Sequence, residues 1–262
     1  MKDYRVKDIT VLNNGTIIRD PRRFVCGIDI NESGEQIELP VFSYLLNTSD
    51  GYILIDTGFN EDILENKEGQ AQNRKLGKFG LKFHISNVLE QVNVKVDEIR
   101  FVIMTHLHYD HAGGLKPFAD RSTKILAQKD EIEYALFSGL CYGDAFYRHK
   151  DLPAGNNWVP ITQNYFGISN SIRLLKVGGH TAGSQIIDVT TMKGNKYLIL
   201  GDLVHMHEEY DKENTGEAAL TNEFIIWKNA IRQIKFFNEK TETKYLFNHD
   251  RRLMDKKELV FE

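Results

Sequence analysis

The sequence predicts an α/β protein whose β-sheets are covered on their outer sides by helices. Two observations lead to this fold class. The first third of the chain holds short apolar runs separated by turn residues, and the rest alternates helix and strand patterns, an order that the second half repeats. The chain has 262 residues with no internal repeat and no serine- or glycine-rich linker, so we expect a single domain over residues 1–262.

Strands dominate the expected structure up to residue 55. The apolar runs Val41–Leu46 and Tyr52–Ile55 predict two of these strands. Three groups of turn-forming residues punctuate the region, and we expect a turn at each of them: Asn13-Asn14-Gly15, Glu32-Ser33-Gly34 and Ser49-Asp50-Gly51.

Helices and strands alternate from residue 86 onward. Ser86 is a candidate N-cap for a helix that carries Val88, Leu89 and Val92. The elements expected after it are a buried strand at Phe101–Met104, a strand at Lys124–Ala127, a helix at Asp130–Phe137 and an irregular stretch after Ser138.

The second half of the chain repeats the order of strands followed by a helix. Its short apolar runs predict strands at Ser171–Val177, Gln185–Val189, Tyr197–Leu200 and Lys244–Phe247. Before the last strand, apolar residues recur at helical spacing and predict a helix with one buried face, formed by Phe224, Trp227, Ile231 and Ile234.

Composition excludes several classes of protein. Lys and Arg total 33 against 37 for Asp and Glu, a net charge of −4, so the chain lacks the basic balance that nucleic-acid binding requires. No apolar run approaches the length of a membrane span, and Met1–Arg5 lead into no apolar segment of a secretory signal. Cys26 and Cys141 are expected to be reduced thiols, although they could pair. These features are typical of a cytoplasmic protein without nucleic-acid or membrane partners.

Three of the nine histidines fall in one run, Thr105-His106-Leu107-His108-Tyr109-Asp110-His111. His106 and His108 are two positions apart as the chain leaves a strand, so they point the same way, and Asp110 and His111 come round in the next turn. Imidazole and carboxylate ligands without a thiolate suit zinc, iron, manganese or cobalt. The run therefore predicts a metal site, the alternative being a polar turn with exposed histidines.

Three more side chains of the ligand type each follow a predicted buried strand, as His106 does. They are His180, Asp202 and His249. Open sheets place their sites at the carboxyl ends of the strands, so we expect these side chains to join the run. Five histidines and two aspartates are enough for two metal ions.

The run from Thr105 to Gly114 resembles the signature of the metallo-β-lactamase superfamily. Other motifs occur in the order typical of that family: Asp56-Thr57-Gly58, Gly179-His180-Thr181-Ala182-Gly183-Ser184, Gly201-Asp202 and Asn248-His249-Asp250. The resemblance covers about residues 38–250. It implies an αββα sandwich, in which two mixed β-sheets are flanked by helices.

Within this superfamily the chain is most similar to the quorum-quenching N-acyl-homoserine lactone hydrolases, through Pro40–Leu46, Leu107, Tyr109 and Phe247–Asp250. The resemblance implies two zinc ions, with iron, manganese and cobalt as alternatives. Carried over position by position, one ion would be held by His106, His108 and His180, the other by Asp110, His111 and His249, with Asp202 between them. A hydroxide shared by the ions would open the lactone of a small-molecule substrate. Asp110 and His205 are the candidate catalytic residues.

The chain departs from the lactonase pattern at His205. The best-known lactonases carry a tyrosine at this position, three residues after the bridging aspartate, and its phenol polarises the lactone carbonyl. We expect a neutral His205 ring to donate a hydrogen bond to the substrate oxygen. Packing away from the pocket, or replacement by the nearby Tyr210, are the alternatives. Ala182 and Ser184 also depart from the family motif, but neither position is a ligand.

Other members of the superfamily fit the sequence less well. Zinc β-lactamases have a cysteine where Asp202 falls, and glyoxalase-type thioesterases add a helical domain where only 13 residues follow His249 here. The remaining alternatives are an organophosphate or aryl-ester hydrolase and, after it, a non-catalytic metal-binding sensor or scaffold.

Two further features leave alternatives open. The segment Tyr134–Phe166 is rich in aromatic residues and predicts a wall or lid over an apolar substrate chain, the alternative being core packing or a homodimer contact. Asp56 either orients a ligand imidazole or caps a turn.

Overall fold

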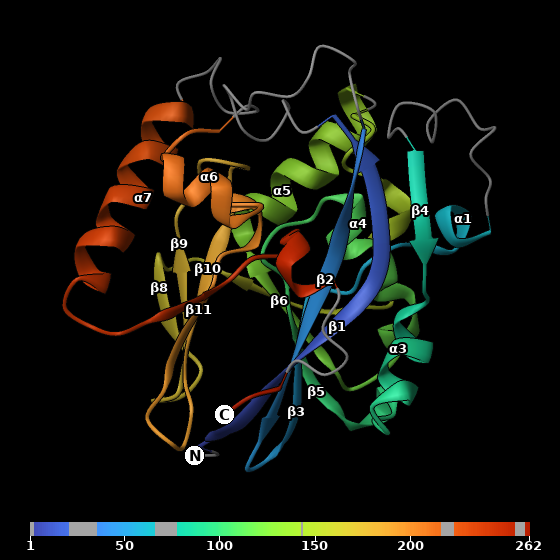
Figure 1. Cartoon of the computed structure of the whole chain (residues 1–262). Helices are drawn as coiled ribbons and strands as arrows, with labels where there is room; N and C mark the ends of the chain where they lie inside the picture. Colours follow the sequence, from blue (N-terminus) through green and yellow to red (C-terminus); the bar gives the residue numbers. More distant parts are fainter. Residues whose placement is uncertain (1–2, 21–35, 66–77, 143, 216–222, 255–259) are drawn as a thin grey trace.

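The chain, seen here in a computed structural model, forms two β-sheets packed face to face, with helices on both outer sides (Figure 1). The structure describes residues 3–20, 36–65, 78–142, 144–215, 223–254 and 260–262. Both sheets combine antiparallel and parallel neighbours. The predicted αββα sandwich of two mixed sheets is therefore confirmed.

Eight strands form the first sheet. They are β1 (Val6–Arg19), β2 (Ile37–Thr48), β3 (Gly51–Ile55), β4 (Lys78–Lys82), β5 (Ile99–Ile103), β6 (Lys124–Gln128), β7 (Asn157–Ile161) and β13 (Val260–Phe261). Their order is β13-β1-β2-β3-β5-β6-β7, with β4 paired to β1. The pairs from β3 to β7 are parallel, so the carboxyl ends of these strands meet at one edge.

Five strands form the second sheet. They are β8 (Tyr165–Gly167), β9 (Ile172–Lys176), β10 (Gln185–Thr190), β11 (Lys196–Ile199) and β12 (Lys244–Leu246). Their order is β12-β11-β10-β9-β8, and β11 and β12 run parallel. The ends of β11 and β12 therefore lie side by side.

The helices complete the outer layers. They are α1 (Glu61–Leu64), α3 (Ile85–Gln91), α4 (Tyr109–Ala112), α5 (Lys129–Phe137), α6 (His207–Lys212) and α7 (Glu223–Asn238). Side chains of β2 alternate between the two faces of the first sheet. Tyr44 and Leu46 pack against the second sheet, whereas Leu45 packs on the opposite face, in the cluster that includes residues of α3. Trp227 and Ile231 of α7 cover the outer face of the second sheet. Among the described residues, no helix is long and apolar enough to cross a membrane.

Two elements near the start of the chain differ from the prediction. Asn13-Asn14-Gly15 forms no turn but lies inside β1, at a shift in its register with β2. Gly15 has a φ of 122°, and a Cβ there would meet the backbone of β4, so this glycine permits close strand contact rather than chain reversal. Helix α3 begins at Ile85, and His84 rather than Ser86 is its N-cap.

The stretch after Ser138 is also more regular than predicted, since it contains β7 and β8. Pro160 makes β7 hard to recognise as a strand from the sequence. The proline is tolerated because β7 lies at the edge of its sheet. The turn at Ser49-Asp50-Gly51 is confirmed, whereas Glu32-Ser33-Gly34 lies outside the described residues. Cys141 is an exposed free thiol, and Cys26 is outside the described part of the chain.

Candidate metal centre

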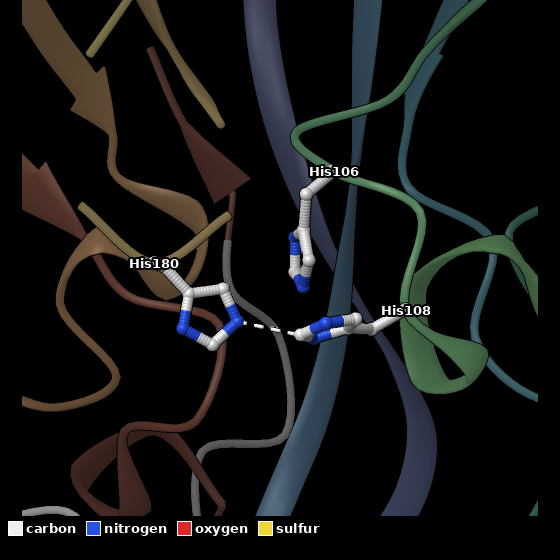
Figure 2. A group of neighbouring side chains, drawn as sticks. All are labelled: His106, His108 and His180. Carbon is white, nitrogen blue, oxygen red and sulfur yellow. Dashed lines mark hydrogen bonds between the residues drawn. The ribbon is translucent and has the colours of Figure 1, made fainter. Parts of the chain in front are cut away.

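The histidine run lies directly beyond the end of β5. His106 and His108 occupy the loop that leaves the strand, and Asp110 and His111 lie in the one-turn helix α4. The ring centroids of His106 and His108 are 4.6 Å apart. Figure 2 shows both rings reaching into the same space, as the two-residue spacing predicts.

The second sheet brings three more side chains to this place. His180 follows β9, Asp202 follows β11 and His249 follows β12. Gly178 and Gly179 have φ values of 65° and 86°, and this left-handed turn aims His180 at the histidine run. The Nε2 atom of His180 lies 3.1 Å from Nδ1 of His108 (Figure 2).

Asp202 lies between two sets of histidines. Its Oδ1 atom is 3.2 Å from Nε2 of His111 and 3.2 Å from Nε2 of His249. Its Oδ2 atom is 3.6 Å from Nε2 of His180 and 3.8 Å from Nε2 of His106. Each carboxylate oxygen thus faces a different set, which is the arrangement of a bridging ligand.

The donor atoms fall into groups that could each hold one cation. Within each group the donor atoms lie within 4.8 Å of one another; the groups are His106, His108, His180; His106, His111, Asp202; Asp110, His111, His249; and His180, Asp202, His205. Three donor atoms of the cluster, Nε2 of His106, Nε2 of His111 and Oδ1 of Asp202, are buried without a hydrogen-bond partner among the described residues. Buried polar atoms rarely lack partners, so this donor set fits metal ions.

Burial and charge set the protonation of these candidate donor groups. Desolvation lowers the pKa of His108 to about 3 and holds the pKa values of His106 and His180 well below their usual range. These three rings are neutral and offer lone pairs. Desolvation is also the largest single influence on His111, but the charges and hydrogen bonds of Asp202 and Asp56 together outweigh it and raise the pKa of that ring. Desolvation opposes ionisation of Asp202, yet His111 and the other rings around the carboxylate lower its pKa well below the usual value.

Asp56 is a buried carboxylate behind this cluster, with a strained φ of 59°. It accepts hydrogen bonds from N and Oγ1 of Thr105, both at 2.8 Å, from Nδ1 of His111 at 2.8 Å and from Nδ2 of Asn248 at 2.9 Å. Because Nδ1 of His111 donates to Asp56, Nε2 of that ring is left for the cluster. Asp56 therefore orients an imidazole, the first of the two roles considered for it.

Glu131 of α5 is a supporting residue that the sequence reasoning missed. Its buried carboxylate accepts hydrogen bonds from N of Leu107 and the Tyr147 hydroxyl, both at 3.0 Å, and from Oγ1 of Thr181 at 2.7 Å and N of Gly183 at 2.9 Å. It thereby ties the loop of His106 and His108 to the loop that follows His180. An acidic residue on the inward face of a predicted helix is the signal that could have found it.

His205 lies in the cluster, and Tyr210 does not. The His205 side chain is 3% exposed, with Nε2 3.5 Å from Oδ2 of Asp202. Oε2 of Glu209 is 3.0 Å from Nδ1 of His205 and accepts a hydrogen bond from its backbone N–H. Tyr210 packs against Tyr245, with ring centroids 4.8 Å apart, in the cluster beneath α7.

The aromatic segment divides between the site and other places. The rings of Phe146 and Tyr147 lie 5.4 and 4.7 Å from the ring of His108. Trp158 and Phe166 pack against the hydrophobic cores instead. The exposed members are Tyr134, Phe137 and Tyr165, and the Tyr142 side chain is outside the described part of the structure. Among the side chains of this segment that the structure describes, Phe146 and Tyr147 therefore lie beside the cluster, whereas Trp158 and Phe166 do not.

Known proteins share both this sequence pattern and this fold. The pattern of the metallo-beta-lactamase superfamily matches residues 37–249. An N-acyl homoserine lactonase of Bacillus sp is 30% identical over 225 residues, which cover 83% of this chain and 84% of that protein. A second, from Agrobacterium fabrum, is 25% identical over 261 residues, which cover 95% of this chain and 91% of that protein. A solved N-acyl homoserine lactone hydrolase, with N-hexanoyl-L-homoserine bound at its catalytic metal centre, matches with a TM-score of 0.80 and 25% identity over 95% of each chain.

Proposed function

Because this chain belongs to the metallo-beta-lactamase superfamily, we propose that it is a metal-dependent hydrolase that opens the lactone ring of N-acyl-homoserine lactones. The observation that carries the proposal is the pair of ligand groups that share Asp202 where the two sheets meet. The lactonases that resemble this chain do so over most of its length, which supports the choice of substrate class.

We propose two zinc ions as the resident metals. His106, His108 and His180 would hold one ion, Asp110, His111 and His249 would hold the other, and Asp202 would be shared. When bound, the two cations would activate a water molecule as the nucleophile and polarise the lactone carbonyl. Nitrogen and oxygen donors without a thiolate also suit iron, manganese or cobalt, so metal analysis decides among them.

Asp110 and His205 are the proposed catalytic residues. The carboxylate of Asp110 is buried, with its two oxygens 4.0 Å from Nε2 of His111 and Nε2 of His249. Each oxygen thus faces a different ring of the proposed ligand set. We propose that this carboxylate also accepts the proton that the attacking water would lose and returns it to the leaving alkoxide. His205 faces the same space from the second sheet.

Phe146 and Tyr147 supply apolar surface beside His108. If the acyl chain lies on these rings, lactones with longer chains should have higher kcat/KM, by about tenfold for each 1.4 kcal/mol of added burial. This preference is the expected contribution of the aromatic segment to specificity.

The test is a hydrolysis screen of the metal-loaded protein on N-acyl-homoserine lactones of different chain lengths, phosphotriesters and aryl esters. Lactones should give the highest kcat/KM, and elemental analysis should find about two metal ions per chain. Asp202→Ala should lose metal and orders of magnitude in activity, whereas Asp211→Ala, at an exposed position on α6, should retain both. Faster turnover of a phosphotriester or aryl ester than of every lactone would reassign the substrate, and full activity without metal would refute the proposal.

A further inference from the structure

His205 and His180 approach the same oxygen of Asp202. Nε2 of His205 lies 3.5 Å from Oδ2 of Asp202, and Nε2 of His180 lies 3.6 Å from that atom. The donor atoms of the three side chains are all within 4.8 Å of one another. They therefore surround one point on the side of Asp202 that faces away from His111 and His249.

Glu209 fixes the His205 ring in the orientation that a ligand needs. Oε2 of Glu209 lies 3.0 Å from Nδ1 of His205, and the same oxygen accepts the backbone N–H of His205 at 2.6 Å. Oε2 of Glu209 already accepts the backbone N–H of His205, so we assign it the same acceptor role toward the ring, which places the ring hydrogen on Nδ1 of His205. A neutral ring in this tautomer has its lone pair on Nε2, directed at Asp202. Carboxylate–histidine–metal arrangements are held in this way.

The burial of Glu209 is a second, independent observation. The residue has no exposed surface, and its Oε1 atom has no hydrogen-bond partner among the described residues. A buried carboxylate with an unsatisfied oxygen is costly unless a positive charge lies nearby. A cation on the far side of the His205 ring would supply that charge.

We propose that His205 is an additional metal ligand, on the side of the centre held by His180, and that Glu209 is the residue that positions it. The proposal rests on the dinuclear function argued above and changes the role of His205 in it. A ring whose hydrogen is on Nδ1, in contact with Glu209, has none on Nε2 to donate to a substrate oxygen. Ligation is therefore favoured over the hydrogen-bond donor role expected from the sequence.

The experiment is a titration of the full-length, chelator-stripped protein with Co²⁺, followed by visible absorption and by competition with a chelator. His205→Phe keeps a ring of similar size without a donor atom. It should weaken the binding of one of the two Co²⁺ ions by at least about tenfold to a hundredfold, because a ligand should matter at least as much as its supporting residue. The visible absorption of that ion should become stronger, because its coordination number falls.

Glu209→Gln is the second variant, since it keeps the shape of the positioning residue and removes its charge. We expect a smaller loss of affinity for the same ion, with the circular dichroism spectrum unchanged. His207→Phe is the matched control: its half-buried ring contacts Glu208 and Asp250 and belongs to no ligand group among the described residues. It should bind both ions as the wild type does.

Wild-type affinity and an unchanged spectrum in both His205→Phe and Glu209→Gln would overturn the proposal, as would a wild-type protein that binds no Co²⁺. Lactone hydrolysis is measured separately on the same samples. A protein that shows the expected Co²⁺ behaviour but opens no lactone supports the ligand and refutes only the proposed substrate.

Discussion

Replacing Glu131 with alanine should lower the free energy of unfolding by several kcal/mol. The carboxylate accepts two buried backbone N–H groups, those of Leu107 and Gly183, and two hydroxyl groups. The hydroxyl groups can rotate to other partners; Oγ1 of Thr181, for example, lies 2.6 Å from Oγ of Ser184. The two N–H groups are held in place by the backbone and cannot do so. A buried donor left without a partner costs about 1–3 kcal/mol, so the two together give about 2–6 kcal/mol.

The assay is urea unfolding of the metal-free protein, which separates loop stability from metal binding. Glu131→Gln retains one acceptor oxygen and should lose about half as much stability as the alanine variant. Glu133→Gln is the matched control on the same helix, because its side chain is 61% exposed and pairs only with Lys129 among the ion pairs described. It should stay within about 0.5 kcal/mol of the wild type. An alanine variant at position 131 that matched this control would refute the reasoning.

Three other changes test separate parts of the structure. Asp56→Asn removes a charged acceptor from His111 and should lower the affinity for one metal ion by about tenfold to a hundredfold in chelator competition. An affinity equal to that of the wild type would contradict the positioning role of Asp56. Gly179→Ala places a Cβ at a φ of 86° and 3.1 Å from Trp227, so urea unfolding should show a loss of about 1–3 kcal/mol rather than none. Burial raises the pKa of Asp151 to about 6, so ionisation of this carboxyl opposes folding. Between pH 4 and 7 the free energy of unfolding of the metal-free wild type should therefore fall by up to roughly 3 kcal/mol relative to that of Asp151→Asn. Parallel stability curves for these two proteins would contradict that assignment.

The sequence was most informative where a histidine or an aspartate follows a buried strand. Each of four such residues lies three or four positions beyond the end of a strand, and the strand ends converge by the geometry of the sheets alone; they are His106, His180, Asp202 and His249. The convergence of these four side chains could therefore be predicted without knowing any side-chain contact. These residues lie beyond the last paired residues of their strands, so an error in predicting strand register would not have changed the expectation that they meet.

Supporting residues could not be found in this way, because their roles depend on contacts between distant segments. Glu131 looks like an ordinary helix residue until the loops of Leu107 and Gly183 reach it. Glu209 is the exception, since it lies only four residues after His205 and its role depends on how the start of α6 places it against that residue. The bulge at Gly15 was mistaken for a turn because glycine serves both purposes, and the close approach of β4 that distinguishes them is a tertiary contact.

The division of the proposed ligands between the two sheets has a consequence for how the molecule folds. A chain in which the first sheet alone had formed would possess His106, His108, Asp110 and His111, but neither Asp202 nor His249. The two ions proposed above would be captured only after the two sheets have met, and contacts between distant parts of a chain form slowly during folding. Ions that bind the assembled sandwich and not its separate halves then hold the assembled state by mass action. The supply of metal in its surroundings would therefore govern how long each molecule survives as well as how fast it works.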